Sequence, residues 1–328
     1  MYIWLDGVIR REGEISISPW SHTLHYGMGV FEGIRSHDGP LGPVVFRLED
    51  HLRRLQTSAD LLGMRLTWDL PALVSAVLET LRVNGLGDAY IRPLAYYGGG
   101  GMTLDNRAHQ VHLMVAAWRW DDDQEDRVRG LRMWIPQVRR PSGASARAQA
   151  KAVGNYLNGQ LALREALAQG ADDALLLDER GYLAEAPAAN LFLVHRGRVC
   201  TPTTEYALAG ITRDTLLRLA RRLGYDVAEM HLGREDLYDA DEAFLSGTVC
   251  GVRAIGSADG HPVQSRRRPS VTDELREVYR ALVRGDSAAL AFIGTDSGRW
   301  LTPVYAARAQ ELVVTREQGV PARAGRSL

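Results

Sequence analysis

The sequence predicts a mixed α/β protein built from two domains. The chain has 328 residues, enough for two cores at roughly 100–200 residues per domain. Segments with strand spacing and helix spacing alternate along most of it. A charged stretch, WDDDQEDR at 120–127, separates an earlier group of these segments from a later one. We therefore predict a small N-terminal domain at 1–122, a linker at 123–135, a larger domain at 136–285 and a tail of undefined structure at 286–328.

The N-terminal elements follow from local patterns. Residues 2–10 predict a hairpin, with Asp6 and Gly7 as the turn between two short apolar strands. The spacing of apolar residues then predicts, in order, a strand at 44–47, helices at 48–62 and 71–83, and strands at 88–97 and 110–118. The second helix has a proline in its first turn and a glycine just beyond its end. The glycines at 98–101 are too flexible for the interior of an element, so they predict a loop.

The C-terminal elements are predicted in the same way. They are, in order, a strand at 132–136, a helix at 155–168, strands at 173–177 and 190–194 around a turn at 178–181, a helix at 212–223, a strand at 242–245 and a final helix at 271–283. Patterning beyond 285 is weaker, and no internal repeat is apparent.

The composition limits the kind of protein. A formal net charge of -1 gives no basic surface for nucleic acid. Two cysteines, Cys200 and Cys250, are too few for a disulfide framework, and no cluster has the spacing of metal ligands. The N-terminus lacks the layout of a signal peptide, and no apolar run approaches the roughly 18 residues of a membrane helix. We expect a cytoplasmic protein with no metal, no nucleic-acid partner and no membrane partner.

Lysine usage singles out one residue. All 39 basic residues are arginine except Lys151. Arginine replaces lysine in salt bridges and on solvated faces, but only lysine loses its proton readily in a protein. A single retained lysine is therefore a candidate for amine chemistry, most commonly a Schiff base with a carbonyl compound. A chance survivor of an arginine-rich composition is the other interpretation, and both stay open on this observation.

Residues suited to an anionic ligand accompany the lysine. Glu185 precedes a predicted strand, GITRD at 210–214 opens a predicted helix, and SGT at 246–248 ends a strand. The free N–H groups and the dipole at a helix start favour phosphate, and Arg54 supplies a guanidinium for a bidentate contact. Taken singly, these features are a helix cap, a solvated carboxylate and a turn. Their combination and order indicate a site.

The order of these motifs resembles that of fold-type IV pyridoxal-phosphate enzymes, and most of all that of branched-chain amino acid aminotransferases. The resemblance extends from about residue 3 to about residue 285. Its motifs are HYGMGVFEGIR at 25–35, VFR at 45–47 with HLRRL at 51–55, YIRP at 90–93, KAVGNYL at 151–157, Glu185 with NLF at 190–192, GITRD at 210–214 and SGT at 246–248. The implied fold is D-amino acid aminotransferase-like, with a small α+β domain, a larger mixed α/β domain and the cofactor between them.

The resemblance implies a role for each residue of the cofactor site. Lys151 would form the Schiff base with pyridoxal 5′-phosphate and move the proton between the substrate Cα and the cofactor. Glu185 would keep the pyridine nitrogen protonated, and Tyr156 would hydrogen-bond the phenolic oxygen. The phosphate site would be formed by Arg54, Ile211, Thr212, Gly247 and Thr248.

The resemblance also implies a substrate side. Arg92 and the hydroxyl of Tyr90 would help to place the substrate carboxylate, and Arg35 is a further candidate for an acidic co-substrate. Met102, in the glycine-rich loop, is a candidate contact. The apolar pocket would be lined by Tyr26, Phe31, Gly33 and Tyr90. Val249 would lie where the carboxylate and the side chain of the substrate meet. The implied reaction is transamination between a branched-chain L-amino acid and 2-oxoglutarate, in a homodimer whose partner subunit contributes to each active site.

The chain departs from the family pattern near this pocket. Val249 stands where the family has alanine, and Ala189 stands where the family often has a carboxylate. Val249 keeps open a preference for aromatic amino acids, amines or a specialised biosynthetic acid. Lyases such as aminodeoxychorismate lyase share the scaffold and the lysine, so they remain an alternative. A binding or structural protein that has lost activity is a further alternative, and the presence together of Lys151, Glu185, Arg54 and Tyr156 argues against it.

Overall fold

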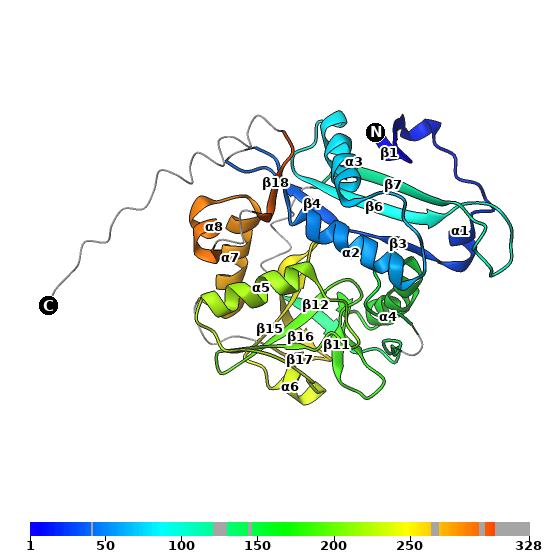
Figure 1. The fold of residues 1–328 in the computed structure, drawn as a ribbon. Coiled ribbons are helices and arrows are strands. Elements are labelled where there is room, and N and C mark those ends of the chain that lie inside the picture. Colours follow the sequence, from blue (N-terminus) through cyan, green and yellow to red (C-terminus); the bar gives the residue numbers. More distant parts are fainter. Residues whose placement is uncertain (41, 121–129, 144–145, 264–268, 295–298, 306–328) are drawn as a thin grey trace.

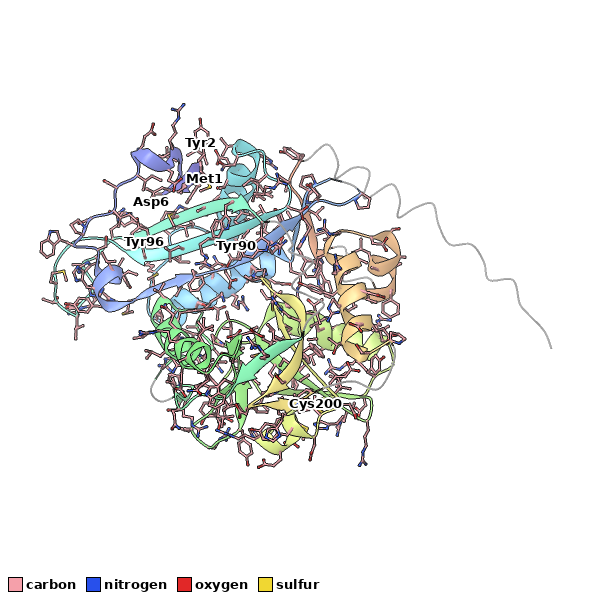
Figure 2. All side chains as sticks on the ribbon, turned by 180° about the vertical axis from the view of Figure 1, so that it is seen from behind. Met1, Tyr2, Asp6, Tyr90, Tyr96 and Cys200 are labelled. Carbon is pink, nitrogen blue, oxygen red and sulfur yellow. The ribbon has the colours of Figure 1, made fainter. Side chains whose placement is uncertain are left out.

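Two β-sheets organise the protein, the first formed mainly by the N-terminal half of the chain and the second by the C-terminal half (Figure 1). The structure is a computed structural model, and it describes residues 1–40, 42–120, 130–143, 146–263, 269–294 and 299–305. The first sheet lies above the second in Figure 1, with helices packed in front of each. Seen from behind, Tyr90 lies on the first sheet and Cys200 in the second (Figure 2).

The first sheet is 8-stranded and antiparallel in every described pairing, in the order β18-β5-β4-β6-β7-β1-β2 with β3 beside β6. Asp6 and Gly7, both with positive φ, make the tight turn between the first two strands, as an Asp-Gly pair favours. The strands are β1 (Tyr2–Leu5), β2 (Val8–Arg11), β3 (Gly29–Phe31), β4 (Ile34–His37), β5 (Val44–Phe46), β6 (Ala89–Tyr97), β7 (Val111–Arg119) and β18 (Leu301–Pro303).

The second sheet is 10-stranded and mixed, in the order β10-β11-β12-β15-β16-β8-β9, with β13, β14 and β17 paired off this path. The strands are β8 (Leu131–Trp134), β9 (Asp173–Ala174), β10 (Leu176–Leu177), β11 (Leu183–Glu185), β12 (Asn190–His195), β13 (Arg198–Pro202), β14 (Val227–Met230), β15 (Glu242–Gly247), β16 (Gly251–Ala258) and β17 (His261–Pro262). Its central strands are buried along nearly their whole length, because helices or loops cover both faces.

The helices divide between the two sheets. Two of them, α2 and α3, bury leucine and valine faces against the first sheet. On the second sheet, α5, α7 and α8 pack over one face and α6 covers the other. The helices are η1 (Glu12–Glu14), α1 (His22–Tyr26), α2 (Leu48–Leu61), α3 (Leu70–Val83), η3 (Val153–Asn155), α4 (Tyr156–Ala168), α5 (Ile211–Arg222), α6 (Arg234–Tyr238), α7 (Val271–Val283) and α8 (Ser287–Ile293). None of the described helices is long and apolar enough to cross a membrane.

Local chemistry explains where some of these helices begin. The side chain of Asp69 accepts a hydrogen bond from the N–H of Ala72 at the start of α3, and Ser270 does the same for Asp273 at the start of α7. The start of α2 depends on tertiary contacts instead. Arg47 adopts a left-handed conformation there, and its side chain donates to Asp50 and to the hydroxyl of Thr215 on α5.

The mixed α/β class and most predicted elements are confirmed. The hairpin at 2–10, the helices at 48–62, 71–83, 155–168 and 212–223, and the long strands at 88–97 and 110–118 all occur within a residue or two of their predicted limits. These segments have strong periodicity or a clear turn signal, and the helices bury one face.

Three predictions were wrong in detail. The strand at 173–177 is two short strands, because β9 pairs in parallel with β8 while β10 pairs with β11. The partner across the turn at 178–181 is therefore β11, and not the strand beginning at Asn190. The helix at 271–283 is not the final element, because α8 and β18 follow it.

The end of the described chain returns to the first sheet. Strand β18 pairs with β5, and the N–H of Arg47 donates to the carbonyl of Trp300. The indole of Trp300 packs against Phe46, with ring centroids 5.8 Å apart. The predicted boundary near 120–127 lies mostly outside the described residues. The domain limits given above therefore stay predictions.

Candidate active site

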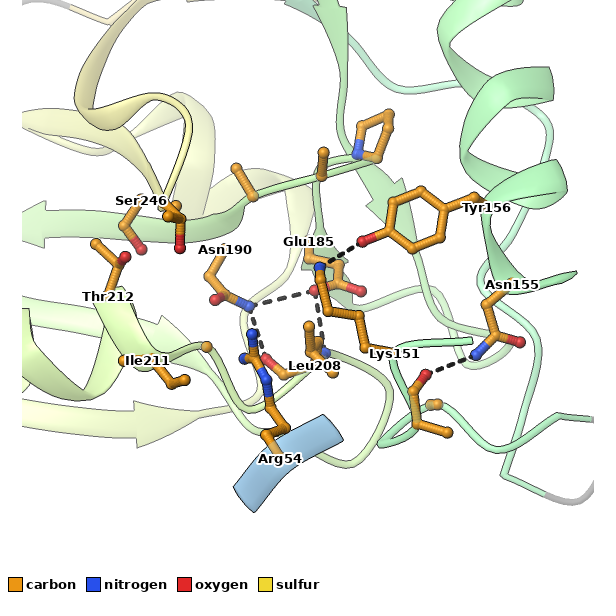
Figure 3. A pocket seen from close by; sticks show the side chains of 18 of the residues that line it. Arg54, Lys151, Asn155, Tyr156, Glu185, Asn190, Leu208, Ile211, Thr212 and Ser246 are labelled. Atoms are coloured by element: carbon orange, nitrogen blue, oxygen red, sulfur yellow. Dashed lines mark hydrogen bonds between the residues drawn. The ribbon is translucent and has the colours of Figure 1, made fainter. Parts of the chain in front are cut away.

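Lys151 lies where the two halves of the chain meet. Its backbone is held by the first half: Phe31 donates its N–H to the Lys151 carbonyl over 3.1 Å, and the Lys151 N–H donates to Ser58 Oγ on α2 over 3.0 Å. Its side chain extends into a cavity lined mainly by the second half, where Nζ lies 2.7 Å from the hydroxyl of Tyr156 (Figure 3). The only lysine of the chain thus lines a cavity with its amine.

The surroundings of Lys151 favour its reactive, neutral form. The pKa of the Lys151 amine is lowered to about 8, mainly by burial; Glu32 opposes this shift and Arg54 contributes to it. Burial likewise raises the pKa of Tyr156 to about 12, with Glu185 as the next cause, so its phenol stays protonated. A neutral amine beside a phenol hydroxyl is suited to attack a carbonyl carbon and to carry a proton afterwards.

Glu185 forms the floor of the cavity from the end of β11. It is buried and makes an ion pair of 2.5 Å with Arg140. Its other oxygen accepts from the side-chain amide of Asn190 over 3.2 Å and from the N–H of Leu208 over 3.1 Å (Figure 3). Burial raises the pKa of the Glu185 carboxyl, although Arg140 opposes this shift. A buried carboxylate that is fixed in direction by these contacts is suited to hold a protonated ring nitrogen.

The opposite end of the cavity presents hydrogen-bond donors. Helix α5 begins there at Gly210, and no side chain caps its first N–H groups. Ser246 Oγ is buried without a hydrogen-bond partner in the described structure, and Gly247 and Thr248 follow it along the cavity wall. A side chain at Gly210 would meet Asn190 Oδ1 at 2.0 Å, so only glycine fits this approach. Free donors and a helix start together form a site for an anion.

Arg54 reaches this anion end from α2 in the first half. Its Nε and Nη2 donate to the two oxygens of Glu32 over 2.7 and 2.9 Å, and Nη1 donates to the carbonyl of Ala209 over 3.0 Å. The bidentate edge expected for a phosphate is therefore occupied by Glu32. Since a guanidinium has five N–H donors, further donors remain for a ligand in the cavity.

A second cavity begins on the other side of Lys151, and it is lined by Phe31, Gly33, Tyr90, Arg92 and Val249 among others. The ring of Phe31 lies 4.9 Å from that of Tyr156, and the Arg92 guanidinium lies 4.5 Å from the centre of the Phe31 ring. Arg92 also donates to the Tyr90 hydroxyl over 2.8 Å. A side chain at Gly33 would meet that hydroxyl at 2.2 Å, so glycine leaves Tyr90 its place.

Three of the predicted substrate residues line neither of the two cavities that contain Lys151. Arg35 is buried on β4, with its guanidinium 5.8 Å from the ring centre of Trp120. Tyr26 and Met102 are exposed and joined to each other, because the Tyr26 hydroxyl donates to the Met102 carbonyl over 2.7 Å. The remaining predicted residues line one or both cavities.

The sequence did not reveal two charged residues of the site. Arg140 was not predicted because nothing in the sequence distinguishes it from the other arginines. Glu32 lies within the motif HYGMGVFEGIR, but nothing in the residues around it indicates that its side chain is buried. Among the described residues, no group of three or more His, Cys, Asp or Glu side chains could hold a metal ion.

The polar groups that line the first cavity fit pyridoxal 5′-phosphate. An amine, a phenol, a fixed carboxylate and an unpartnered serine hydroxyl beside a helix start match the aldehyde, the phenolic oxygen, the ring nitrogen and the phosphate of that cofactor. The fold and this site define a class of protein: a pyridoxal-phosphate-dependent enzyme. The sequence model of the family described as "Amino-transferase class IV" matches residues 29–258, and the chain belongs to this family.

Individual relatives show which kind of class IV aminotransferase the chain resembles. The branched-chain-amino-acid aminotransferase of Pseudomonas aeruginosa is 38% identical over 291 residues, which cover 88% of this chain and 95% of that protein. The solved branched-chain aminotransferase of the thermophilic archaeon Thermoproteus uzoniensis, with norvaline, matches with a TM-score of 0.86 and 38% identity, covering 93% of this chain and 99% of that one. The Escherichia coli enzyme matches with a TM-score of 0.86 and 35% identity, covering 93% and 99%. Within class IV, the chain is a member of the branched-chain-amino-acid aminotransferases, and the predicted fold type is confirmed.

Proposed function

We propose that this chain transfers the amino group of a branched-chain L-amino acid to 2-oxoglutarate, and that the residues named above perform the transfer. Its cofactor is pyridoxal 5′-phosphate, as in the Thermobaculum terrenum branched-chain amino acid aminotransferase solved in its PLP-form. The observation that carries the proposal is the position of Lys151, whose amine lies between a cavity of polar donors and a cavity with aromatic walls. One amine can thus serve the cofactor on one side and the substrate on the other.

The residues of the first cavity hold the cofactor in this proposal. When bound, the cofactor supplies an electron-withdrawing ring that makes the Cα proton of an attached amino acid acidic. The amides of Ile211 and Thr212, with Ser246, Thr248 and Arg54, bind the phosphate. Glu185 keeps the ring nitrogen protonated, and the Tyr156 hydroxyl donates to the phenolic oxygen. Lys151 is the general base and acid that moves the proton from Cα.

The residues of the second cavity select the substrate. Phe31, Tyr90 and Val249 give it apolar walls, which favour a hydrocarbon side chain over a polar one. Arg92 and the Tyr90 hydroxyl supply a charged and a neutral donor for a carboxylate. The same two groups accommodate the amino acid and the acidic acceptor in turn.

We also propose that the chain acts as a homodimer. Support comes from exposed apolar side chains around α1 and the neighbouring loop: Trp20, Leu24 and Leu104 are 62%, 70% and 78% exposed. Tyr26 and Met102 lie in this region, where a partner subunit would bring them to a site. Light scattering tests this proposal: we expect the mass of a dimer, and a smaller mass for Leu24→Asp. A monomeric wild-type protein would contradict it.

Absorbance of the bound cofactor tests the reaction. Single amino acids are added to the protein loaded with pyridoxal phosphate, and we expect L-leucine, L-isoleucine and L-valine to convert its visible band to that of pyridoxamine phosphate. D-amino acids should leave the band unchanged. A visible band that stays unchanged with all three L-amino acids would contradict the branched-chain substrate assignment. Pyruvate release from an aminodeoxychorismate substrate without an amino acceptor would identify a lyase instead.

A further inference from the structure

Glu32 is the most deeply buried charged residue near the cofactor cavity, and the mechanism above does not use it. It lies between β3 and β4 with 0% of its surface exposed. Its carboxylate accepts from Nε and Nη2 of Arg54 over 2.7 and 2.9 Å, from Nδ1 of His51 over 2.7 Å and from the N–H of Gly33 over 3.3 Å. Since a charged carboxylate can only accept, Nδ1 of His51 carries its proton in this contact, and all four contacts stabilise the negative charge.

The charge of Glu32 is stable only because of these partners. Burial by itself would raise the pKa of its carboxyl, but Arg54 and His51 together hold the pKa well below its usual range. A buried carboxylate without such partners would be strongly destabilising. Arg54 depends on Glu32 in turn, because Glu32 is the only carboxylate that pairs with Arg54 in the described part of the chain.

The geometry of this pair leaves Arg54 one orientation. The fork on Glu32 fixes the plane of the guanidinium, and the bond from Nη1 to the Ala209 carbonyl fixes its end beside the start of α5. The remaining donors therefore belong to a guanidinium that lines the same cavity as Ile211 and Thr212. Glu32 also follows Phe31 directly and precedes Gly33, two residues that line the second cavity.

We infer that Glu32 is a positioning residue, which holds Arg54 at the angle that the cofactor phosphate requires and links the phosphate end to the wall of the substrate cavity. This inference rests on the proposed role of Arg54 at the phosphate. The competing account is that Glu32 only neutralises the charge of Arg54. The two accounts predict opposite effects, because removing a neutralising charge would strengthen the binding of an anion, whereas removing a positioning contact weakens it.

The test compares cofactors with and without phosphate. In Glu32→Gln one acceptor oxygen becomes a donor that faces the donors of Arg54, so the fork is lost. We expect the dissociation constant of pyridoxal phosphate to rise at least tenfold, and that of pyridoxal to change less than twofold, both measured from the visible absorbance. Glu49→Gln is the matched control, because Glu49 pairs with the neighbouring Arg53 on the exposed face of α2, with 57% and 61% of the two side chains exposed.

A double-variant cycle separates the possible outcomes. If Glu32 acts through Arg54, Glu32→Gln should add no further loss to Arg54→Gln. Unchanged or tighter binding of pyridoxal phosphate by Glu32→Gln, or equal losses for both cofactors, would overturn the inference. Should Arg54→Gln itself bind pyridoxal phosphate normally, the proposed phosphate site would fail instead. Glu32→Asp keeps the charge but shortens the contact; it carries the same test if Glu32→Gln does not fold, and we expect it to lose phosphate selectivity too.

Discussion

Arg54 and Arg92 both reach the cavities around Lys151 from the first half of the chain, but their surroundings differ. Arg54 lies on α2 and donates two hydrogen bonds to the fully buried carboxylate of Glu32. Arg92 lies on β6, where it contacts the ring of Phe31 and donates to the hydroxyl of Tyr90. Within the described structure no carboxylate pairs with Arg92, and its Nε is buried without a partner.

This difference matches two kinds of anion. A guanidinium held by a carboxylate is fixed in direction and largely balanced in charge, which suits a phosphate that stays bound. A guanidinium with only neutral partners keeps an unbalanced charge in a partly buried site, which suits a carboxylate that enters and leaves in each reaction. The two ends of the site should therefore respond differently to substitution, as the following experiments test.

Lys151 separates the two ends, so its removal should abolish the reaction while leaving both arginines in place. We expect Lys151→Ala to reduce turnover at least about 10⁴-fold, because the loss of a general base and of the covalent anchor combine. Lys151→Arg should be equally inactive, since arginine stays protonated. The measurement is the half-reaction with L-leucine in single turnover. Substantial activity in either variant would contradict the assignment.

The burial of Lys151 sets a pH dependence for its amine. Because burial lowers its pKa to about 8, the neutral form should increase about 50-fold between pH 6 and pH 8 and level off above that. The cofactor-free protein is treated with a simple aldehyde and a reductant, and the peptide containing Lys151 is quantified by mass spectrometry. Nα-acetyl-lysine, whose side-chain amine is free, is the control in the same solution. The reactivity of this amine should continue to rise towards pH 10. Parallel profiles would show that the site does not shift this pKa.

Arg92 should affect substrate binding and leave cofactor binding unchanged. Losing a charged hydrogen-bond donor costs about 1.5–3 kcal/mol, so we expect Arg92→Gln to lower kcat/KM about 10- to 100-fold for both the amino acid and 2-oxoglutarate. The dissociation constant of pyridoxal phosphate should stay within about twofold. Steady-state kinetics and cofactor titration measure the two effects, with the exposed Arg53→Gln as a control. A loss of cofactor affinity in Arg92→Gln would remove the distinction between the two arginines.

Val249 should produce the smallest effect, and only on selectivity. Its side chain lines the substrate cavity and is 44% exposed, so replacing it removes bulk without leaving a buried void. We expect Val249→Ala to raise the kcat/KM ratio of L-phenylalanine to L-valine about tenfold, within the range for a small change in an apolar pocket. Val249→Ile should lower the same ratio. An unchanged ratio in both variants would show that Val249 does not limit the side chain of the substrate.

Much of the cofactor site could be predicted because its chemistry requires particular residue types, which are visible in the sequence. A single lysine among arginines, a carboxylate before a strand, and Gly-Ile-Thr before a helix indicated a site through their combination and order. The structure brings Lys151, Glu185, Ile211 and Thr248 to one cavity, as the order of motifs implied.

Other features could not be predicted, because they depend on which side chains the fold brings together. The sequence alone determined the α/β class, the long elements and the residues with irreplaceable chemistry, because periodicity and functional groups are local properties. Only the tertiary structure decided that Glu32 occupies the bidentate edge of Arg54 and that Arg140 balances Glu185. Buried charges need partners, and in this protein those partners come from distant segments that no local pattern connects.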